Sequence, residues 1–307
     1  MTIIVDFSQV AISVCIVNLS TDLKKGKTGD ESYNLIRHMV LYTILGFKRK
    51  YPNHGDILLA IDSPSYWRRD YFPAYKGQRK HGREESDLDW GVIQESIRKL
   101  KEEIREYLPW KVIETHGAEA DDIIGVLSKY LQTNELVQDG IFSEEPQPIM
   151  ICSADGDHEQ LQKYKNVRQW SPLLKKELKL KGSAIGCINE HIAQGDGGDN
   201  IPNCLTSDQW AIDRANNIDD KHRQTPMKKT RLQEFIDLGI DACKTEEEKR
   251  NWIRNRTLVD YDYIPDELQA RIIQDYIDSK PSKNKMRMMT WFAKNRMKKL
   301  YDEAGSI

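Results

Sequence analysis

Three short apolar runs in this chain of 307 residues each lead into a carboxylate. They are Ile3–Val5 before Asp6, Leu58–Ile61 before Asp62, and Ile149–Cys152, which Asp155 follows after two residues. Apolar runs of this length are typical of strands buried on both faces, as in a parallel sheet. Because ligands of an open α/β sheet lie beyond the carboxyl ends of its strands, the pattern predicts a functional site at that edge.

The carboxylates that stand out are nine in number and form five short clusters. The clusters are Asp6; Asp62; Glu119, Asp121 and Asp122; Asp155 and Asp157; and Asp196 and Asp199. Grouped acids need cations, and hard oxygen ligands select Mg²⁺ or Mn²⁺. Two such ions roughly 4 Å apart can activate water and stabilise the leaving oxygen of a phosphodiester. A single Asp after a strand is more often a helix N-cap, but five clusters together favour a metal site.

A basic and aromatic segment follows Asp62. Pro64, Pro73, Gly77 and Gly82 interrupt any regular pattern over residues 63–87, and so long an irregular stretch is usually functional or disordered. Its candidate nucleic-acid-binding residues are Tyr66, Trp67, Arg68, Arg69, Tyr75, Lys76, Arg79 and Lys80. Bases stack on aromatic rings and cationic groups hold phosphates, so we expect the segment to guide a strand to the acids. Lys76 could also stabilise transition-state charge. The alternative is a solvated loop whose aromatic residues fold back onto the core.

Strand and helix patterns alternate in the first part of the chain. We expect strands at 2–6, 56–61, 111–115 and 148–152, helices at 32–50, 88–108 and 118–132, and a polar loop at 134–147. Beyond residue 185 helices dominate, with candidates at 225–238, 245–256, 265–279 and 286–302. The prediction is an α/β domain at 1–184 with a mostly parallel central sheet, including a basic segment at 63–90, followed by an all-helical domain at 185–307.

Composition narrows the class of protein further. Charged residues make up 31% of the chain, the net charge is −2, and no apolar run approaches 18 residues, so we expect no membrane span and no secretion signal. The five cysteines are widely spaced, which argues against zinc and disulfides and favours a reducing cytoplasm. Eight Lys and Arg residues lie between Lys280 and Lys299 without an acid, a surface that could pack on the core or contact a partner or DNA.

The order of these motifs resembles that of the structure-specific 5′ nucleases, or flap endonucleases. The shared elements are Asp6, Asp62 followed by Trp-Arg-Arg and Tyr-Lys-Gly-x-Arg, Glu119-Ala-Asp-Asp122, Asp155-Gly-Asp157, and Gly195-Asp-x-x-Asp-Asn-Ile-Pro202. Each piece is weak by itself, but the ordered set is specific and the resemblance covers nearly the whole chain.

The resemblance implies a metal-dependent 5′-to-3′ exonuclease and flap endonuclease that removes RNA primers and flaps during lagging-strand replication. It implies a 5′-nuclease, PIN-like α/β fold with a helix–three-turn–helix region, two Mg²⁺ ions for which Mn²⁺ can substitute, and all nine acids at metal-site positions. Lys76 and Arg79 match basic residues at the base of a helical arch. The expected ligands are branched or nicked duplex DNA and RNA–DNA hybrids. The resemblance also implies a phage single-strand DNA-binding protein and a sliding clamp as partners, and a monomer in the cytoplasm of the host cell.

One motif departs from the family. Many members continue past the Asn-Ile-Pro sequence with a glycine-rich hairpin that grips duplex DNA, whereas Pro202 is followed here by Asn-Cys-Leu-Thr-Ser-Asp. We hypothesise that basic side chains farther along replace that grip; these are Lys221, Arg223, Lys228, Lys229 and Arg231.

Two other classes of protein remain open at this point. An aspartyl-phosphate phosphatase also places Asp at strand ends, although its usual Asp-x-Asp is absent from Asp6-Phe7-Ser8. A non-catalytic replication scaffold could bind branched DNA through a metal-stabilised acidic fold. We expect no histidine within the acid clusters, and we interpret His158 as a helix N-terminal residue rather than a base.

Overall fold

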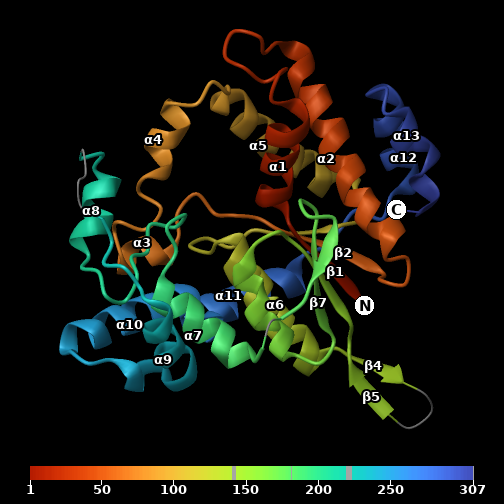
Figure 1. The fold of residues 1–307 in the computed structure, drawn as a ribbon. Helices are drawn as coiled ribbons and strands as arrows, with labels where there is room; N and C mark the ends of the chain where they lie inside the picture. Colours follow the sequence, from red (N-terminus) through yellow and green to blue (C-terminus); the bar gives the residue numbers. More distant parts are fainter. Residues whose placement is uncertain (140–142, 181, 219–222, 307) are drawn as a thin grey trace.

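The computed structural model describes residues 1–139, 143–180, 182–218 and 223–306. Its centre is a six-stranded sheet in the order β3-β2-β1-β6-β7-β8 (Figure 1). The strands are β1 (Thr2–Asp6), β2 (Asp56–Ala60), β3 (Lys111–Ile113), β6 (Ile149–Cys152), β7 (Val167–Ser171) and β8 (Lys176–Leu178). All neighbours pair in parallel except β7 and β8. The prediction of a mostly parallel central sheet is confirmed.

The strand order reverses direction at β1. From β1 the chain builds outward through β2 and β3 on one side, and later through β6 and β7 on the other. A reversal of this kind opens a crevice at the carboxyl ends of the two central strands. Asp6 ends β1 and pairs in register with Ala60, while Val5 pairs with Cys152. Asp62 and Asp155 follow those partner strands, so the three strand-end acids emerge at one edge.

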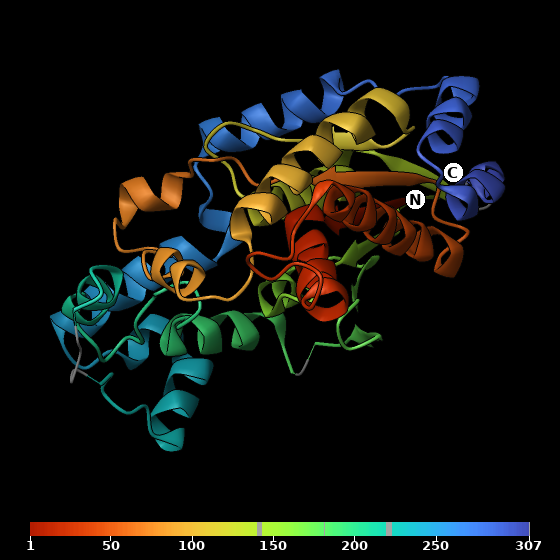
Figure 2. The same ribbon diagram turned by 90° about the horizontal axis from the view of Figure 1, so that it is seen from above.

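Helices cover both faces of the sheet, which explains why the strands are apolar throughout (Figure 2). On one face α1 (Phe7–Leu19), α2 (Asp30–Lys50) and α5 (Trp90–Tyr107) share a buried core with Ile3 and Val5. On the other face α6 (Ala120–Asn134) and α11 (Asp266–Asp278) share a core with Ile4. The two-residue alternation of a strand sends neighbouring side chains into opposite cores.

Two elements within the α/β region differ from the prediction. The stretch 134–147, expected to be a polar loop, forms the antiparallel pair β4 (Leu136–Asp139) and β5 (Ser143–Pro146) outside the main sheet. The residues 63–87, expected to lack regular structure, contain the short helices α3 (Trp67–Tyr71) and α4 (Arg79–Glu84). In Figure 1 this segment rises from α3 through α4 to α5, on the side of α1 away from α2.

The region beyond residue 183 is helical, as predicted. Its first helices, α7 (Ala184–Gln194), α9 (Lys229–Leu238) and α10 (Glu246–Val259), surround a core that includes Phe235 and Trp252. The remaining elements before residue 264 are α8 (Gln209–Ala215), η2 (Gly239–Ala242) and η3 (Tyr261–Tyr263). The expected start of α9 at Thr225-Pro226 is wrong, because Thr206 Oγ1 accepts the Thr225 amide and holds it in an irregular segment.

The last helices pack on the α/β region. α11 lies against α6, and α12 (Lys285–Lys294) and α13 (Lys298–Asp302) place Met288, Trp291 and Leu300 in the core shared with α2 and α5. A short 3-10 turn, η4 (Ala304–Ser306), follows. The single helix expected at 286–302 is interrupted where Arg296 adopts a left-handed φ of 54°. The division into domains at residue 184 stays a prediction. Within the described ranges, no helix combines the length and apolar character that crossing a membrane requires.

Candidate active site

Each strand-end acid is held at the start of a helix. Asp6 Oδ1 caps α1 by accepting the Gln9 amide at 3.0 Å, and Asp155 Oδ1 accepts the Asp157 amide at 3.0 Å where η1 (Gly156–Lys163) begins. Asp62 Oδ1 accepts the amide of Ala120, the first residue of α6, at 2.9 Å. The structural interpretation of such residues as N-caps is therefore compatible with a functional one, since capping orients each carboxylate toward the sheet edge.

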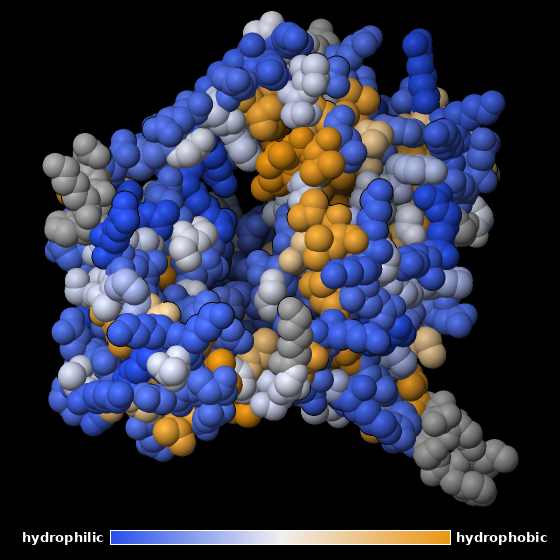
Figure 3. Space-filling view, in the orientation of Figure 1, coloured by the Kyte–Doolittle hydropathy of each residue, from blue (hydrophilic) through white to orange (hydrophobic). Residues whose placement is uncertain are grey.

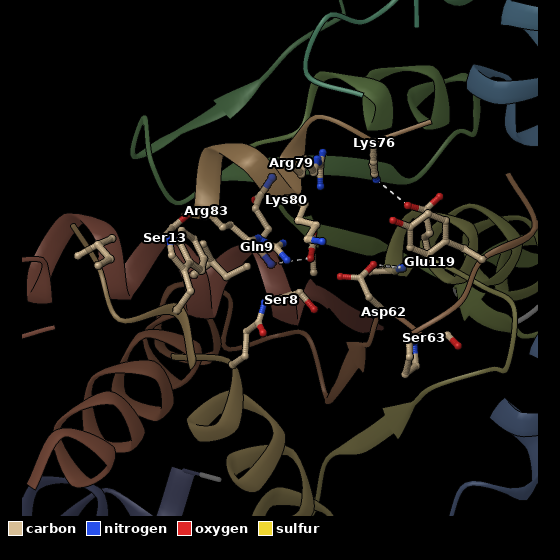
Figure 4. A pocket seen from close by; sticks show the side chains of 18 of the residues that line it. Ser8, Gln9, Ser13, Asp62, Ser63, Lys76, Arg79, Lys80, Arg83 and Glu119 are labelled. Atoms are coloured by element: carbon tan, nitrogen blue, oxygen red, sulfur yellow. Dashed lines mark hydrogen bonds and ion pairs between the residues drawn. The ribbon is translucent and has the colours of Figure 1, made fainter. Parts of the chain in front are cut away.

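These acids line a cavity of about 930 Å³ beneath α4. The acids at its floor are Asp6, Asp62, Glu119, Asp121 and Asp155, two further acids, Glu84 and Asp89, line it at the ends of the helices above, and its basic residues are Lys25, Arg69, Lys76, Arg79, Lys80 and Arg83. Figure 3 shows the hollow at the centre of the molecule, bordered by hydrophilic residues and by an apolar strip over α1. In Figure 4 the cations of the α4 segment lie across the cavity from Asp62. The cavity thus has an acidic floor and a basic wall.

Three of the acids on the floor lack a cationic partner. Burial and the nearby Asp62 raise the pKa of Asp6 to about 8, and burial together with Asp157 raises the pKa of Asp155 to about 6. Burial and the charge of Asp155 also raise the pKa of Asp121 well above its usual range. Within the described ranges no Lys or Arg forms an ion pair with any of the three. A set of oxygen donors with this deficit of positive charge fits a divalent cation.

A histidine joins the second group of acids. Ligand atoms of Asp157, His191 and Asp196 lie within 4.8 Å of one another, and His191 Nδ1 lies 2.9 Å from Asp157 Oδ1. Although burial opposes it, the Asp157 carboxylate raises the pKa of His191 to about 9, and the imidazolium in turn lowers the pKa of Asp157. The expectation that no histidine belongs to the acid clusters is wrong. His191 lies in the last turn of α7, five residues before Asp196. This short separation in sequence was the signal that could have identified His191 as a member of the acid cluster.

A second histidine, His158, lies next to Asp6 and Asp121. His158 is fully buried, and its ligand atoms lie within 4.8 Å of those of Asp6 and Asp121. Burial lowers the pKa of His158 to about 4, so the ring is neutral. It is the third residue of η1, as its interpretation as a helix N-terminal residue required, but the fold also brings it to the acids.

The remaining acids on the α4 side are neutralised by the chain itself. Arg68 Nη1 lies 2.9 Å from Glu119 Oε2 and 2.7 Å from Asp122 Oδ1, and all three side chains are buried. The other oxygen of Asp122 accepts the Glu119 amide at 2.9 Å and Trp67 Nε1 at 3.2 Å. Asp122 is therefore fully engaged within the protein, and it does not line the cavity with the other acids.

Lys76 joins the basic segment to two acids. Its Nζ lies 2.6 Å from Glu119 Oε1 and 3.3 Å from Asp199 Oδ2, while its backbone amide donates to the Asp199 carbonyl at 2.8 Å. The residue has a left-handed φ of 54°, which turns the chain sharply at this point. Arg79 also pairs with Asp199, and Tyr75 donates its hydroxyl to Asp199 Oδ2 at 2.7 Å. The base of the segment is thus docked on the turn at 196–201.

The expected nucleic-acid-binding residues fall into three places. Tyr66, Arg69, Lys76, Arg79 and Lys80 line the cavity. Arg68 and Tyr75 are buried among the acids and Trp67 is half-buried against Asp122, because the carboxylates compete for these donors. Lys228 and Lys229 are exposed at the start of α9, outside the cavity. Of the residues proposed to replace the hairpin, Arg231 is paired with Glu234 and Glu248, and Lys221 lies outside the described residues.

Comparisons with known proteins place this site in a family. The family model for the 5′-3′ exonuclease N-terminal resolvase-like domain matches residues 18–185, and the model for the C-terminal region of T4 RNase H matches residues 182–306. The chain belongs to the 5′-3′ exonuclease family. It is 35% identical over 306 residues to Ribonuclease H of Enterobacteria phage T4, covering 97% of this chain and 92% of that protein. A protein of this family is a hydrolytic nuclease.

Solved structures share the fold. The bacteriophage T5 5′-exonuclease with bound zinc is 18% identical and has a TM-score of 0.58, covering 91% of this chain and 99% of that one. A T5 flap endonuclease variant in a complex with DNA and metal ions is 16% identical, also with a TM-score of 0.58, covering 90% and 98%. At these identities the likeness shows the architecture of the sheet and the helices around it.

Proposed function

We propose that the chain is a divalent-metal-dependent 5′-to-3′ exonuclease and flap endonuclease that acts on RNA–DNA and DNA–DNA duplexes. Family membership supports nuclease activity, and the observation that carries the finer proposal is the cavity itself. Uncompensated carboxylates form its floor and the cations of the α4 segment form its wall. A phosphodiester needs both, because its phosphate is anionic and its leaving oxygen must be stabilised as the bond breaks.

The donor set supports two divalent cations, with Mg²⁺ as the physiological ion and Mn²⁺ able to replace it. Asp6, Asp62, Asp121 and Asp155 would hold the first and Asp157 and Asp196 the second, with Asp199 as an outer ligand of the second ion because Lys76 and Arg79 already pair with it. When bound, the ions lower the pKa of a water and polarise the scissile phosphate. Glu119 and Asp122 act farther out in this proposal, because Arg68 occupies both.

The chain's own residues bind and orient the substrate. Lys76 is held by Glu119 and Asp199 and lines the cavity, so its ammonium is positioned to offset charge on a phosphate. Arg69, Lys80 and Arg83 line the same wall and make no ion pair within the described ranges that would occupy their charge, apart from a long contact of Lys80 with Glu84. Tyr66 offers a ring on which a base can stack. A strand entering the cavity would thus meet cations before it reaches the acids.

The biological setting follows from the same proposal. We infer removal of RNA primers and flaps in lagging-strand replication of a phage, by a monomer in the host cytoplasm. The relative from phage T4 supports the phage setting. A phage single-strand DNA-binding protein and a sliding clamp are the proposed partners, and branched or nicked duplexes are the proposed ligands. The complex of the T5 flap endonuclease with DNA supports DNA as a ligand. The proposed domains are residues 1–184 for the chemistry and 185–307 for duplex binding, with Lys228 and Lys229 as candidate contacts.

A cleavage assay with a 5′-labelled flap or nicked duplex tests the proposal. We expect Mg²⁺-dependent release of short products that EDTA abolishes, and loss of cleavage by at least about a thousandfold in Asp155→Asn, because the substitution removes a metal ligand. DNA binding should be retained or tightened, since a negative charge is lost.

Asp237→Asn provides the matched control for that variant. Asp237 is exposed on α9, away from the cavity, so the same chemical change there should leave cleavage intact. Cleavage that persists in EDTA, or full activity of Asp155→Asn with Mg²⁺, would refute the proposal.

A further inference from the structure

A buried polar chain runs from the C-terminal region to one of the acids. Tyr261 of η3 places its hydroxyl 2.8 Å from Nδ1 of His158, and Nε2 of the same imidazole lies 3.4 Å from Asp121 Oδ1. Tyr261 is 6% exposed and His158 is fully buried, so no solvent competes for these groups. Residues 158 and 261 are more than one hundred positions apart, and neither belongs to the acid motifs.

The fold accommodates this contact at a specific glycine. Gly125 lies one helical turn after Asp121 in α6, and a Cβ atom at this position would stand 2.9 Å from Cγ of Tyr261. Any larger residue would push the tyrosine ring away from α6. The backbone of Tyr261 is held as well, because its amide donates at 3.0 Å to Gln160, whose side-chain amide donates at 2.9 Å to the Asp157 carbonyl. The ring is therefore tied to the segment that carries Asp157 and His158.

The position of the proton on the His158 ring decides which groups donate and which accept between Tyr261, His158 and Asp121. A neutral imidazole carries one N–H, and its two nitrogens are a donor and an acceptor. If Nδ1 carried the proton, the Tyr261 hydroxyl would have no acceptor within the described residues, and the Nε2 lone pair would face the oxygen of Asp121, which is a carboxylate whenever Asp121 is ionised to hold a cation. With the proton on Nε2, the tyrosine O–H donates to Nδ1 and the N–H points at Asp121. Nε2 forms no hydrogen bond within the described ranges, and Asp121 Oδ1, at 3.4 Å, is the acceptor that it faces just beyond the usual N–H···O distance.

We propose that Tyr261 and His158 are positioning residues that orient the Asp121 carboxylate for a divalent cation in the cavity. His158 holds Oδ1 from the protein side, which leaves the other oxygen for the cavity that Asp121 lines. Tyr261 acts one step farther away by keeping the imidazole in the Nε2–H form. Partners of this kind orient metal ligands and are worth about 10- to 100-fold in metal affinity. The inference rests on the proposed function only in that Asp121 holds a cation.

The tautomer of His158 can be measured without any cleavage. Two-bond ¹H–¹⁵N correlation spectra of the full-length, metal-free protein, recorded at a pH high enough to ionise Asp121, report which ring nitrogen carries the proton, and His158→Gln identifies the signals. We expect the Nε2–H tautomer in the wild type, and a shift toward a tautomeric mixture in Tyr261→Phe. An Nδ1–H tautomer would overturn the proposal. A Zn²⁺-loaded protein in which Zn²⁺ has replaced the proton on Nε2 would also overturn it, because His158 would then be a metal ligand itself.

Calorimetric titration with Mn²⁺ tests the consequence. His158→Leu should weaken binding about tenfold, whereas His158→Gln, whose side-chain amide can donate from the Nε2 position, should stay within about threefold of the wild type. Tyr261→Phe should show an intermediate loss. Equal losses for Leu and Gln, or no loss for Leu, would contradict positioning by an N–H donor.

Tyr276→Phe is the matched control for the tyrosine substitution. Tyr276 is also buried and its hydroxyl donates at 2.8 Å to Glu135, far from the acids, so its removal should leave Mn²⁺ affinity unchanged. Failure of the proposed function is distinguishable from failure here. A wild type that neither binds Mn²⁺ nor cleaves would refute the function, while the tautomer of the metal-free protein decides the positioning pair by itself.

Discussion

The acids around the cavity form two groups with opposite surroundings. On the α4 side, Glu119 and Asp122 form ion pairs with Arg68, and Asp199 forms ion pairs with Lys76 and Arg79. Asp6 and Asp155 at the strand ends, and Asp121 beside them in the first turn of α6, form no ion pair with Lys or Arg among the described residues, and their pKa values are raised. The residue types are alike in the two groups, but only one group is neutralised from within.

This difference separates two tasks that the sequence presents as one. The neutralised acids fasten the basic segment to α6 and to the turn at 196–201. Their charges are compensated by Arg and Lys side chains and stabilise the fold. The strand-end acids keep a deficit of positive charge that burial makes costly. A divalent cation removes that cost. The acids without a Lys or Arg partner, rather than all nine acids, are therefore the centre of the proposed metal site.

The largest expected effect comes from breaking the neutralised group. Arg68→Leu leaves Glu119 and Asp122 buried without a counter-charge, so we expect a loss of about 3–5 kcal/mol in the free energy of unfolding, measured by urea denaturation. Arg98→Leu removes an exposed pair with Glu95 and should leave the unfolding midpoint unchanged. A loss for Arg68→Leu no greater than that of the control would show that the pairing is not structural.

Neutralising a strand-end acid should have the opposite sign. Asp6→Asn removes a charge whose burial is uncompensated and keeps the cap of α1, since Asn caps a helix as well as Asp. We expect the metal-free protein at pH 8 to gain roughly 2–4 kcal/mol in unfolding free energy while cleavage is lost. The matched variant Asp199→Asn, which removes an acid paired with Lys76, should lose stability instead. Equal signs for the two would erase the distinction between the groups.

The smallest effect concerns the cavity wall. Lys80 is exposed and lines the cavity, so Lys80→Ala should weaken binding of a 5′-flap substrate in Ca²⁺ and lower the salt slope of the association constant by about 1. Lys165→Ala, on an exposed turn outside the cavity, is the control. Lys229→Ala measured alongside tests whether the start of α9 also contacts the duplex. An unchanged salt slope for Lys80→Ala would show that Lys80 on α4 does not contact the substrate.

Much of the fold could be predicted because its signals are local. Apolar runs that lead into Asp6 and Asp62 mark strands covered on both faces, and helical spacing marks α2, α5 and α6. Other elements lack such signals. α1 is apolar on most sides, with Ile16 and Val17 exposed, so it shows no helical face, and the strands β4 and β5 are largely polar.

The site was predictable as a set of residues but not as a set of partnerships. The acids occur in short motifs, whereas Arg68 meets Asp122 across 54 positions and Tyr261 meets His158 across 103. Such pairs depend on the docking of the basic segment and of the C-terminal helices on α6. For the same reason, the burial of Arg68 and Tyr75 could not be distinguished from exposure on a loop.

The most direct test of the account is the pH dependence of stability with and without Mg²⁺. A carboxyl whose pKa is raised by folding binds its proton more tightly in the folded state, so stability falls as pH rises from the ordinary value near 3.8. For Asp155 the loss extends to about pH 6, and for Asp6 to about pH 8. His191, with a pKa of about 9, adds a loss of the same sign above its ordinary value near 6.5, whereas His158, whose pKa burial lowers to about 4, adds a gain in stability as pH rises from about 4 to that ordinary value.

We therefore predict that the metal-free protein loses unfolding free energy between about pH 6.5 and pH 8, the range in which the contribution of His158 is complete and Asp6 and His191 both lower stability. Mg²⁺ should restore the loss at pH 8 and have little effect near pH 5, where protons already neutralise the acids, and Asp6→Asn should flatten the metal-free curve. Metal-free stability that does not fall over this range, or a Mg²⁺ effect that is no larger at pH 8 than at pH 5, would contradict the claim that the strand-end acids lack a counter-charge of their own.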